Sequence, residues 1–264
     1  MPDAILETLE RIENALQLAA CTVSPFVPGA VKAEQKSQGR GPVTEADHAS
    51  NHVLRETLVR DGEGWLSEES VDSLDRLGRE RVWIVDPLDG TLEFVSGIPE
   101  WCISVAMVED GRAIAGGILN PATGEVFLGA KGKGLTYNGQ PAGAKSRTDL
   151  HGAVVLASRS EIKRGEWEVF KDGPVTVQPC GSVAYKLARV AAGLADATWT
   201  LTPKHEWDVA AGIALVEAAG GFAAGLNGEP VTLNSQSALL HGLIAAGSSL
   251  KQPIMGLLEP HLRG

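Results

Sequence analysis

The sequence predicts an α/β protein in which an α+β lobe is followed by an α/β lobe. In residues 1–145, two segments with the apolar spacing of amphipathic helices precede a series of short apolar runs separated by turn residues, which is typical of helices and then an antiparallel sheet. In residues 146–264, apolar runs alternate with helical segments, which is typical of helices packed on a sheet. Because clefts commonly lie where two such lobes meet, we expect the functional site between them.

The N-terminal lobe begins with two predicted helices. Residues 3–20 place apolar side chains at helical spacing, and a second helix starts at Thr44. Between them, residues 35–42 are polar and rich in glycine, so we expect a loop there. Asp47 follows Thr44 by three residues, and this spacing permits a capping box, which is a structural role for the acid.

Short apolar or alternating runs then predict the strands of a sheet at 65–67, 82–85, 101–109, 113–119 and 125–129. Asp110-Gly111 and Asn138-Gly139 are typical of hairpin turns. We expect Pro87 to end the strand that begins at Val82, because proline cannot donate to a sheet ladder.

The C-terminal lobe shows the alternation of strands and helices. Apolar runs predict strands at 154–157, 175–178, 196–201 and 243–246. Helical spacing predicts helices at 164–171, 182–192 and 208–219.

Length and composition narrow the class of protein. The chain has 264 residues, of which 44% are hydrophobic and 21% charged, as is ordinary for a globular protein. No apolar run approaches the roughly 18 residues needed to cross a bilayer, and the first residues lack a signal-peptide pattern. Cys21, Cys102 and Cys180 have neither metal-type nor disulfide-type spacing, so we expect reduced thiols and a cytoplasmic protein.

The charge of the chain limits its partners. A formal net charge of −10 argues against a nucleic-acid polymer, because that binding depends on lysine and arginine side chains that neutralise phosphates. An acidic enzyme can still bind a small phosphate ester when bound cations reverse the local charge.

The turn from Asp86 to Thr91 (Asp-Pro-Leu-Asp-Gly-Thr) is the strongest candidate for a functional site. Its two carboxylates follow a buried strand, and oxygen-rich corners of this kind suit Mg²⁺. One alternative is an aspartate-rich turn that only caps the next helix. Another is a haloacid-dehalogenase phosphatase, but there the two aspartates are two residues apart, whereas Asp86 and Asp89 are three apart.

Further acids and glycines occur in a fixed order in Thr44-Glu45-Ala46-Asp47, Ser67-Glu68-Glu69, Asp86-Pro87-Leu88-Asp89-Gly90-Thr91 and Trp207-Asp208-Val209-Ala210-Ala211-Gly212. Together these motifs resemble the inositol monophosphatase superfamily of metal-dependent, lithium-sensitive phosphomonoesterases, which includes the 3′-phosphoadenosine 5′-phosphate phosphatases. The resemblance covers most of the chain. It implies a layered αβαβα sandwich of the type that fructose-1,6-bisphosphatase shares, and commonly a homodimer.

The resemblance also implies a role for each matched residue. The ligands of two or three Mg²⁺ ions would be Glu68, Asp86, the backbone carbonyl of Leu88, Asp89 and Asp208. Glu68 and Thr91 would orient the attacking water, Asp47 would lie near a third metal position, and the N–H groups of Gly90 and Thr91 would hold phosphate oxygens. Lys36 is similar to a family lysine that orders water near the metals.

The substrate is a separate question. Where inositol-specific members carry a glutamate about seven residues before the last aspartate, this chain has Leu201, and the next acid is Glu206. A leucine cannot accept hydrogen bonds from inositol hydroxyls, which weakens the inositol interpretation. Four motifs are more similar to the 3′-phosphoadenosine 5′-phosphate phosphatases, and this resemblance favours that substrate: Leu66-Ser67-Glu68-Glu69, Gly90-Thr91-Leu92-Glu93-Phe94, Ala157-Ser158-Arg159-Ser160 and His205-Glu206-Trp207-Asp208.

Several residues are candidates for contact with that substrate. Gly181 and Ser182 would meet the sugar, Lys186 or Arg159 a second phosphate, and Glu206 is a further candidate. Inositol 1-phosphate, or activity on both substrates, is the alternative, because residues 129–134 are more similar to inositol monophosphatases. A non-catalytic regulator that binds metal and phosphate is the alternative from another class.

Overall fold

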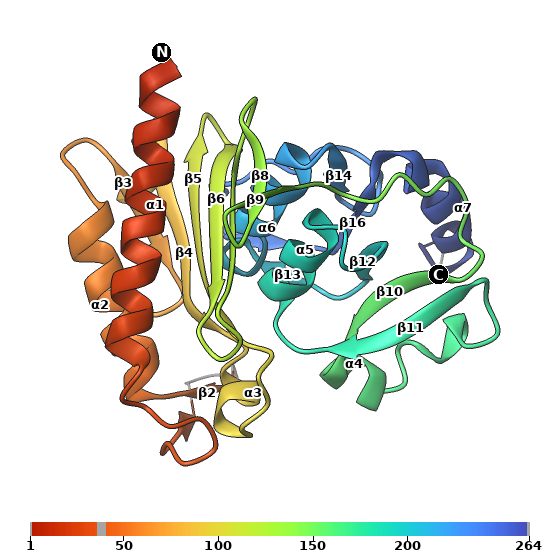
Figure 1. The fold of residues 1–264 in the computed structure, drawn as a ribbon, viewed down its shortest axis with the longest axis horizontal. Helices are drawn as coiled ribbons and strands as arrows, with labels where there is room; N and C mark the ends of the chain where they lie inside the picture. The colour runs from red at the N-terminus through yellow and green to blue at the C-terminus, as the bar shows by residue number, and fades with distance from the viewer. Residues whose placement is uncertain (1, 36–40, 263–264) are drawn as a thin grey trace.

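The structure is a computed structural model that describes residues 2–35 and 41–262. It is built of five layers, in the order helices, sheet, helices, sheet, helices (Figure 1). The first and last layers carry the two ends of the chain, and the arrangement confirms the sandwich that the resemblance implies. No described helix is long and apolar enough to span a membrane.

The first sheet has seven strands that follow each other in chain order: β3 (Gly64–Ser67), β4 (Arg81–Asp89), β5 (Cys102–Glu109), β6 (Arg112–Asn120), β7 (Glu125–Ala130), β8 (Gly134–Tyr137) and β9 (Gln140–Ala142). All neighbours are antiparallel except β3 and β4, which are parallel. The predicted sheet is therefore confirmed, with β8 and β9 as additional strands and with β3 and β4 as the one parallel pair among the described strands of this sheet.

The second sheet has five strands in the order β11 (Val175–Cys180), β10 (Ala153–Ser158), β12 (Ala197–Thr200), β16 (Leu243–Gly247) and β14 (Gly221–Ala224). β10 is parallel to both β11 and β12, whereas β16 is antiparallel to both of its neighbours. Two short antiparallel pairs lie outside the large sheets: β1 (Glu34–Gln35) with β2 (Pro42–Val43), and β13 (Lys204–His205) with β15 (Leu239–Leu240).

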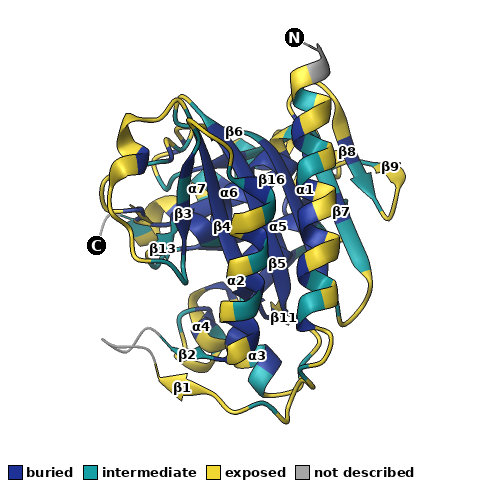
Figure 2. Ribbon diagram, turned by 90° about the vertical axis from the view of Figure 1, so that its left-hand side faces the viewer, coloured by how far each residue is buried: buried dark blue, intermediate teal, exposed yellow. Residues whose placement is uncertain are grey.

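Three apolar cores hold the layers together. The helices α1 (Pro2–Val23) and α2 (Glu45–Leu58) cover one face of the first sheet, against Trp83 and Val85. The helices α5 (Val183–Ala191) and α6 (Glu206–Ala218) lie between the two sheets, against Val82, Ile84 and strands of the second sheet. Figure 2 shows the central strands buried, while α1 and α2 keep an exposed outer face.

The third core lies on the outer face of the second sheet. There Trp199 and Ile244 pack against α7 (Lys251–Leu262) and the 3₁₀ turn Glu168–Phe170. The short helix α4 (Arg159–Lys163) follows β10 on the same side.

Two predicted elements differ from the structure, one in its end and one in its existence. The strand β4 does not end at Pro87 but continues to Asp89, because the ladder to β5 shifts register between Asp86 and Asp89, and such a bulge tolerates a proline. The helix predicted at 164–171 is absent: α4 ends at Lys163, and Gly165 takes a φ of 79° that stops the helix.

Candidate active site

The predicted acids meet where β4 ends and α6 begins. Asp86, Asp89 and Asp208 each offer a carboxylate oxygen, and these oxygens lie within 4.8 Å of one another. Asp86 and Asp89 are buried, and Asp208 is half-buried. The structure thus brings together side chains that are more than a hundred residues apart in the chain.

The turn after Asp86 is held by its own hydrogen bonds. The Leu88 N–H donates to Asp86 Oδ1 at 3.0 Å, and the Ser50 hydroxyl donates to the Pro87 carbonyl at 2.8 Å. Gly90 has a φ of 94°, and a Cβ atom there would lie 3.0 Å from the Glu100 carbonyl oxygen. Only glycine therefore suits the position before α3 (Thr91–Val95).

Asp47 contacts this turn through Thr91. The Thr91 hydroxyl lies 3.0 Å from Asp47 Oδ1 and 3.1 Å from the Leu88 carbonyl oxygen. The other Asp47 oxygen accepts the N–H and the hydroxyl of Thr44, at 2.8 and 2.7 Å. This confirms the predicted capping box at the start of α2 and gives Asp47 a second role, which is to hold the Thr91 hydroxyl.

Asp208 is placed by the first turn of α6. The His205 N–H donates to Asp208 Oδ2 at 2.9 Å, as in a capping box. Burial raises the pKa of Asp208 well above its ordinary value, and the negative charges of Asp89 and Glu68 raise it further. Glu68 follows directly after β3, next to the end of β4.

This concentration of carboxylates fits a divalent cation. The donors are all hard oxygens, which suit Mg²⁺. Burial and mutual repulsion raise the pKa of Asp208, and a bound cation would counter both effects by favouring the ionised carboxylate. Burial also raises the pKa of Asp89, against the effect of hydrogen bonds from Ser182 and Ala184 and of the charges on Lys186 and Lys204.

One predicted substrate contact is wrong. Glu206 is completely buried, and its two carboxylate oxygens accept the N–H groups of Asn234 and Ser235 at 2.7 and 2.8 Å. Glu206 thus attaches the loop at Asn234 and Ser235 to α6, and its side chain is not accessible to a substrate.

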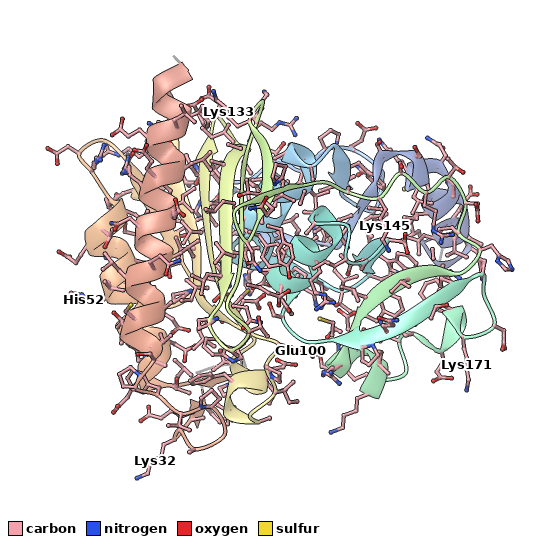
Figure 3. All side chains as sticks on the ribbon, in the orientation of Figure 1. Lys32, His52, Glu100, Lys133, Lys145 and Lys171 are labelled. Carbon is pink, nitrogen blue, oxygen red and sulfur yellow. The ribbon has the colours of Figure 1, made fainter. Side chains whose placement is uncertain are left out.

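The two predicted cations lie in different settings. The Arg159 guanidinium donates to both oxygens of Glu100, at 2.6 and 2.7 Å, and Glu100 also accepts the Gly181 N–H at 2.7 Å. Figure 3 shows Glu100 between the two sheets, so this contact joins the first sheet to the second. Lys186 is only 5% exposed, and its ammonium makes no hydrogen bond or ion pair to any residue in the described ranges.

Sequence reasoning missed an ion pair next to these residues, between the buried Glu161 and the half-buried Lys204. Lys204 donates to Glu161 at 2.9 Å, and its charge acts on Asp89 and Asp208. Lys204 could have been predicted from its position four residues before Asp208, whereas nothing in the sequence around Glu161 indicates its role. Lys36 lies outside the described residues, as does most of the predicted loop at 35–42.

The layered fold and the acidic cluster define a class, the metal-dependent phosphoric monoester hydrolases of the inositol monophosphatase and fructose-1,6-bisphosphatase type. The chain belongs to the inositol monophosphatase family, whose model matches residues 6–261.

Known relatives agree with this assignment. An inositol-1-monophosphatase of Mesorhizobium japonicum is 34% identical over 227 residues, which cover 81% of this chain and 82% of that protein. A fructose-1,6-bisphosphatase/inositol-1-monophosphatase of Thermotoga maritima is 30% identical over 217 residues, which cover 80% of this chain and 82% of that protein. The structure of inositol monophosphatase from Anabaena superposes with a TM-score of 0.81 at 25% identity and covers 97% of both chains.

Proposed function

We propose that this protein hydrolyses small phosphomonoesters of the inositol or sugar type with Mg²⁺ as its cofactor. The proposal rests on the convergence of Asp86, Asp89 and Asp208, whose carboxylate oxygens lie within 4.8 Å of one another. They form a candidate cation site between the end of β4 in the first sheet and the start of α6 in the helix layer. The relatives named as inositol-1-monophosphatases support inositol 1-phosphate as the first substrate to test. A homodimer stays a prediction.

Bound magnesium ions would supply charge neutralisation of the phosphate and activation of water. In this proposal Asp86, Asp89 and Asp208 hold the ions together with Glu68 and the Leu88 carbonyl oxygen.

Other groups of the chain would act on the phosphate and the water. The N–H groups of Gly90 and Thr91 donate to phosphate oxygens, and the Thr91 hydroxyl orients the water with Glu68. Asp47 holds that hydroxyl in place at 3.0 Å. Positioning and charge neutralisation then supply most of the rate acceleration.

A second candidate substrate is 3′-phosphoadenosine 5′-phosphate, which the sequence favours. The observation behind it is the pair of ammonium groups, Lys186 and Lys204, whose charges act on Asp89. Leu201 packs with the apolar core on the outer face of the second sheet and offers no acceptor to a polyol, which counts against inositol 1-phosphate.

The test is phosphate release from inositol 1-phosphate, fructose 1,6-bisphosphate and 3′-phosphoadenosine 5′-phosphate, with Mg²⁺ and after its removal by a chelator. We expect release that depends on Mg²⁺ and is inhibited by lithium. A preference above about tenfold in kcat/KM, or about 1.4 kcal/mol, assigns the substrate. Metal binding without release from any of the three would instead support the non-catalytic regulator.

A further inference from the structure

Asp89, at the end of β4, is held by hydrogen bonds from the start of α5. Its Oδ2 atom accepts the Ser182 hydroxyl at 2.5 Å and the Ala184 N–H at 2.6 Å. Within the described part of the chain, the other oxygen of Asp89 accepts no hydrogen bond, so it is the oxygen that remains for a cation.

We propose that Ser182 is a positioning residue that fixes the carboxylate of Asp89 and thereby sets the affinity for the metal, rather than a residue that contacts the sugar. The inference rests on the proposed function in one respect, which is the role of Asp89 as a metal ligand.

The hydroxyl of Ser182 is fully engaged. It donates its single hydrogen to Asp89 and accepts the Tyr185 N–H at 2.9 Å, and Cys102 Sγ lies 3.3 Å away. The residue is only 7% exposed. A sugar hydroxyl would therefore find neither a free donor nor exposed surface at this position.

The backbone of Ser182 supports the same conclusion. Its φ of 56° and ψ of 129° are unfavourable for a residue with a side chain, and glycine would adopt them at lower cost. Such conformations persist where the surroundings hold them, often at functional sites. The serine is thus kept in a strained conformation in which its hydroxyl reaches Asp89.

The contact also crosses the sandwich. Asp89 ends β4 in the first sheet, whereas Ser182 follows β11 in the second sheet. The helix α5 that begins after Ser182 packs on α6, which carries Asp208. The hydrogen bond therefore aligns the ligand from the first sheet with the ligand from the helix layer.

The result expected for loss of the hydroxyl follows from other metal sites. Hydrogen bonds to a carboxylate are among the stronger ones, and removing the partner of a metal ligand commonly weakens metal binding 10- to 100-fold. The Ala184 N–H would still restrain Asp89, so binding should be weakened and not abolished.

The test is Ser182→Ala, with Mg²⁺ and Mn²⁺ binding measured by titration calorimetry on the full chain without substrate. We expect binding about 10- to 100-fold weaker, the same rise in the Mg²⁺ concentration needed for half-maximal activity, and a substrate KM at saturating Mg²⁺ within about threefold of wild type. Ser182→Gly, which suits the positive φ, should lose metal affinity equally and so separates the hydroxyl from folding. Cys102→Ala removes the other neighbour of Ser182 and should leave metal affinity unchanged.

Unchanged metal affinity in Ser182→Ala, with a substrate KM raised at saturating Mg²⁺, would overturn the inference. Ser182 would then be a contact to the sugar, as the sequence predicts. The companion variant Asp89→Asn keeps the two failures apart. If Asp89→Asn itself binds Mg²⁺ as wild type does, the proposed metal site is wrong, whatever the Ser182 variants do.

Discussion

Glu161 is a buried carboxylate that its neighbours keep ionised. It is 2% exposed and accepts hydrogen bonds from Lys204 at 2.9 Å, Thr200 at 2.7 Å and Trp167 at 3.1 Å. Burial alone would raise the pKa of Glu161, but the Lys204 ammonium and the hydrogen bonds lower it to about 2. Because the charge of Lys204 also acts on Asp89 and Asp208, the ion pair contributes to the electrostatics of the acidic cluster.

This pKa gives a prediction for stability in acid. Because the folded-state pKa of about 2 lies below the ordinary 4.5, the stability from Glu161 is complete above pH 4.5 and is lost as the pH falls towards 2. The total is about 3 kcal/mol, of which about 1 kcal/mol is lost by pH 3.5. The measurement is the free energy of unfolding in urea at pH 6 and at pH 3.5. Between these pH values it should fall by about 1 kcal/mol more in wild type than in Glu161→Gln. Equal losses in the two proteins would contradict it.

Asp208 gives a second prediction at this scale, in which activity and stability change in opposite directions. Asp208→Asn removes a proposed metal ligand, so we expect kcat/KM to fall by at least about 10³-fold. It also removes a charge that Asp89 and Glu68 repel, so without metal the variant should unfold at the same or a higher urea concentration than wild type.

The matched control is Glu69→Gln, which changes an acid beside Glu68 and should cost less than about tenfold in kcat/KM. An Asp208→Asn variant with near wild-type activity would remove Asp208 from the metal site.

Among the elements, α6 is the one on which the layers depend. It lies between the two sheets, and small residues let its backbone approach the first sheet and the neighbouring helix α5. A Cβ atom on Gly116 of β6 would lie 2.6 Å from the Ala211 carbonyl oxygen of α6. On the other side, a Cβ atom on Gly212 would lie 2.4 Å from the Cβ of Leu187 in α5.

Gly212→Ala should therefore destabilise the protein although alanine is the better helix former. Propensity alone would add about 1 kcal/mol of stability, but the overlap with Leu187 forces α5 and α6 apart and should cost about 1–3 kcal/mol net. Gly256 of α7 is a matched control, because a Cβ atom there meets nothing within 4 Å. Chemical denaturation should show Gly256→Ala as stable as wild type or more so, and equal effects of the two substitutions would refute the packing argument.

The elements that the sequence predicts well are those whose signal is the spacing of apolar residues within the element itself. The helices at 3–20 and after Thr44 were found because their buried faces repeat at helical spacing. The last helix, α7, was missed because Pro253, Gly256 and Pro260 interrupt that spacing. The proline that falls within β4 was misjudged because a bulge depends on the partner strand and not on the proline itself.

The same distinction applies to the site. The acids of the cluster were predicted because their motifs match the order and spacing of the family's motifs, and the structure brings Asp86, Asp89 and Asp208 together. The partners of Glu206 and Ser182 were not predictable, since Asn234 and Asp89 reach them only through the folded layers.

At the scale of the whole molecule, the site forms only when the layers are correctly placed, because its carboxylates come from β4 in the first sheet and from α6 between the sheets. Arg76, which is 2% exposed, makes one of the links. Its guanidinium pairs with Asp72 at 2.8 Å and donates to Asn234 at 2.6 Å and to the Ser235 carbonyl at 2.9 Å. The loop at Asn234 is the one that Glu206 fastens to the start of α6, so Arg76 acts on the helix that carries Asp208.

Loss of this link should weaken the whole molecule. Arg76→Ala leaves the acceptors of Asn234 and Ser235 unsatisfied and should lower the free energy of unfolding by about 2–4 kcal/mol. Arg76→Lys should recover less than half of the loss, since an ammonium cannot reproduce the fork of a guanidinium. Arg60, which pairs with Glu7 at the exposed surface, serves as control, and Arg60→Ala should cost less than about 1 kcal/mol. Equal losses for Arg76→Ala and Arg60→Ala would contradict the role of the link.

The metal should in turn stabilise the assembled molecule. A cation that binds the three carboxylates binds the folded protein only, because Asp208 is separated from the other two ligands in the unfolded chain. At a Mg²⁺ concentration of 100 times the dissociation constant, the gain is about 2.7 kcal/mol, which corresponds to a rise in Tm of about 5–10 °C for a chain of this size. Thermal melts with MgCl₂ and with NaCl of the same ionic strength separate specific binding from screening. The Mg²⁺-specific rise should disappear in Asp208→Asn, and a rise of the same size in that variant would mean that the ion stabilises the protein at another place.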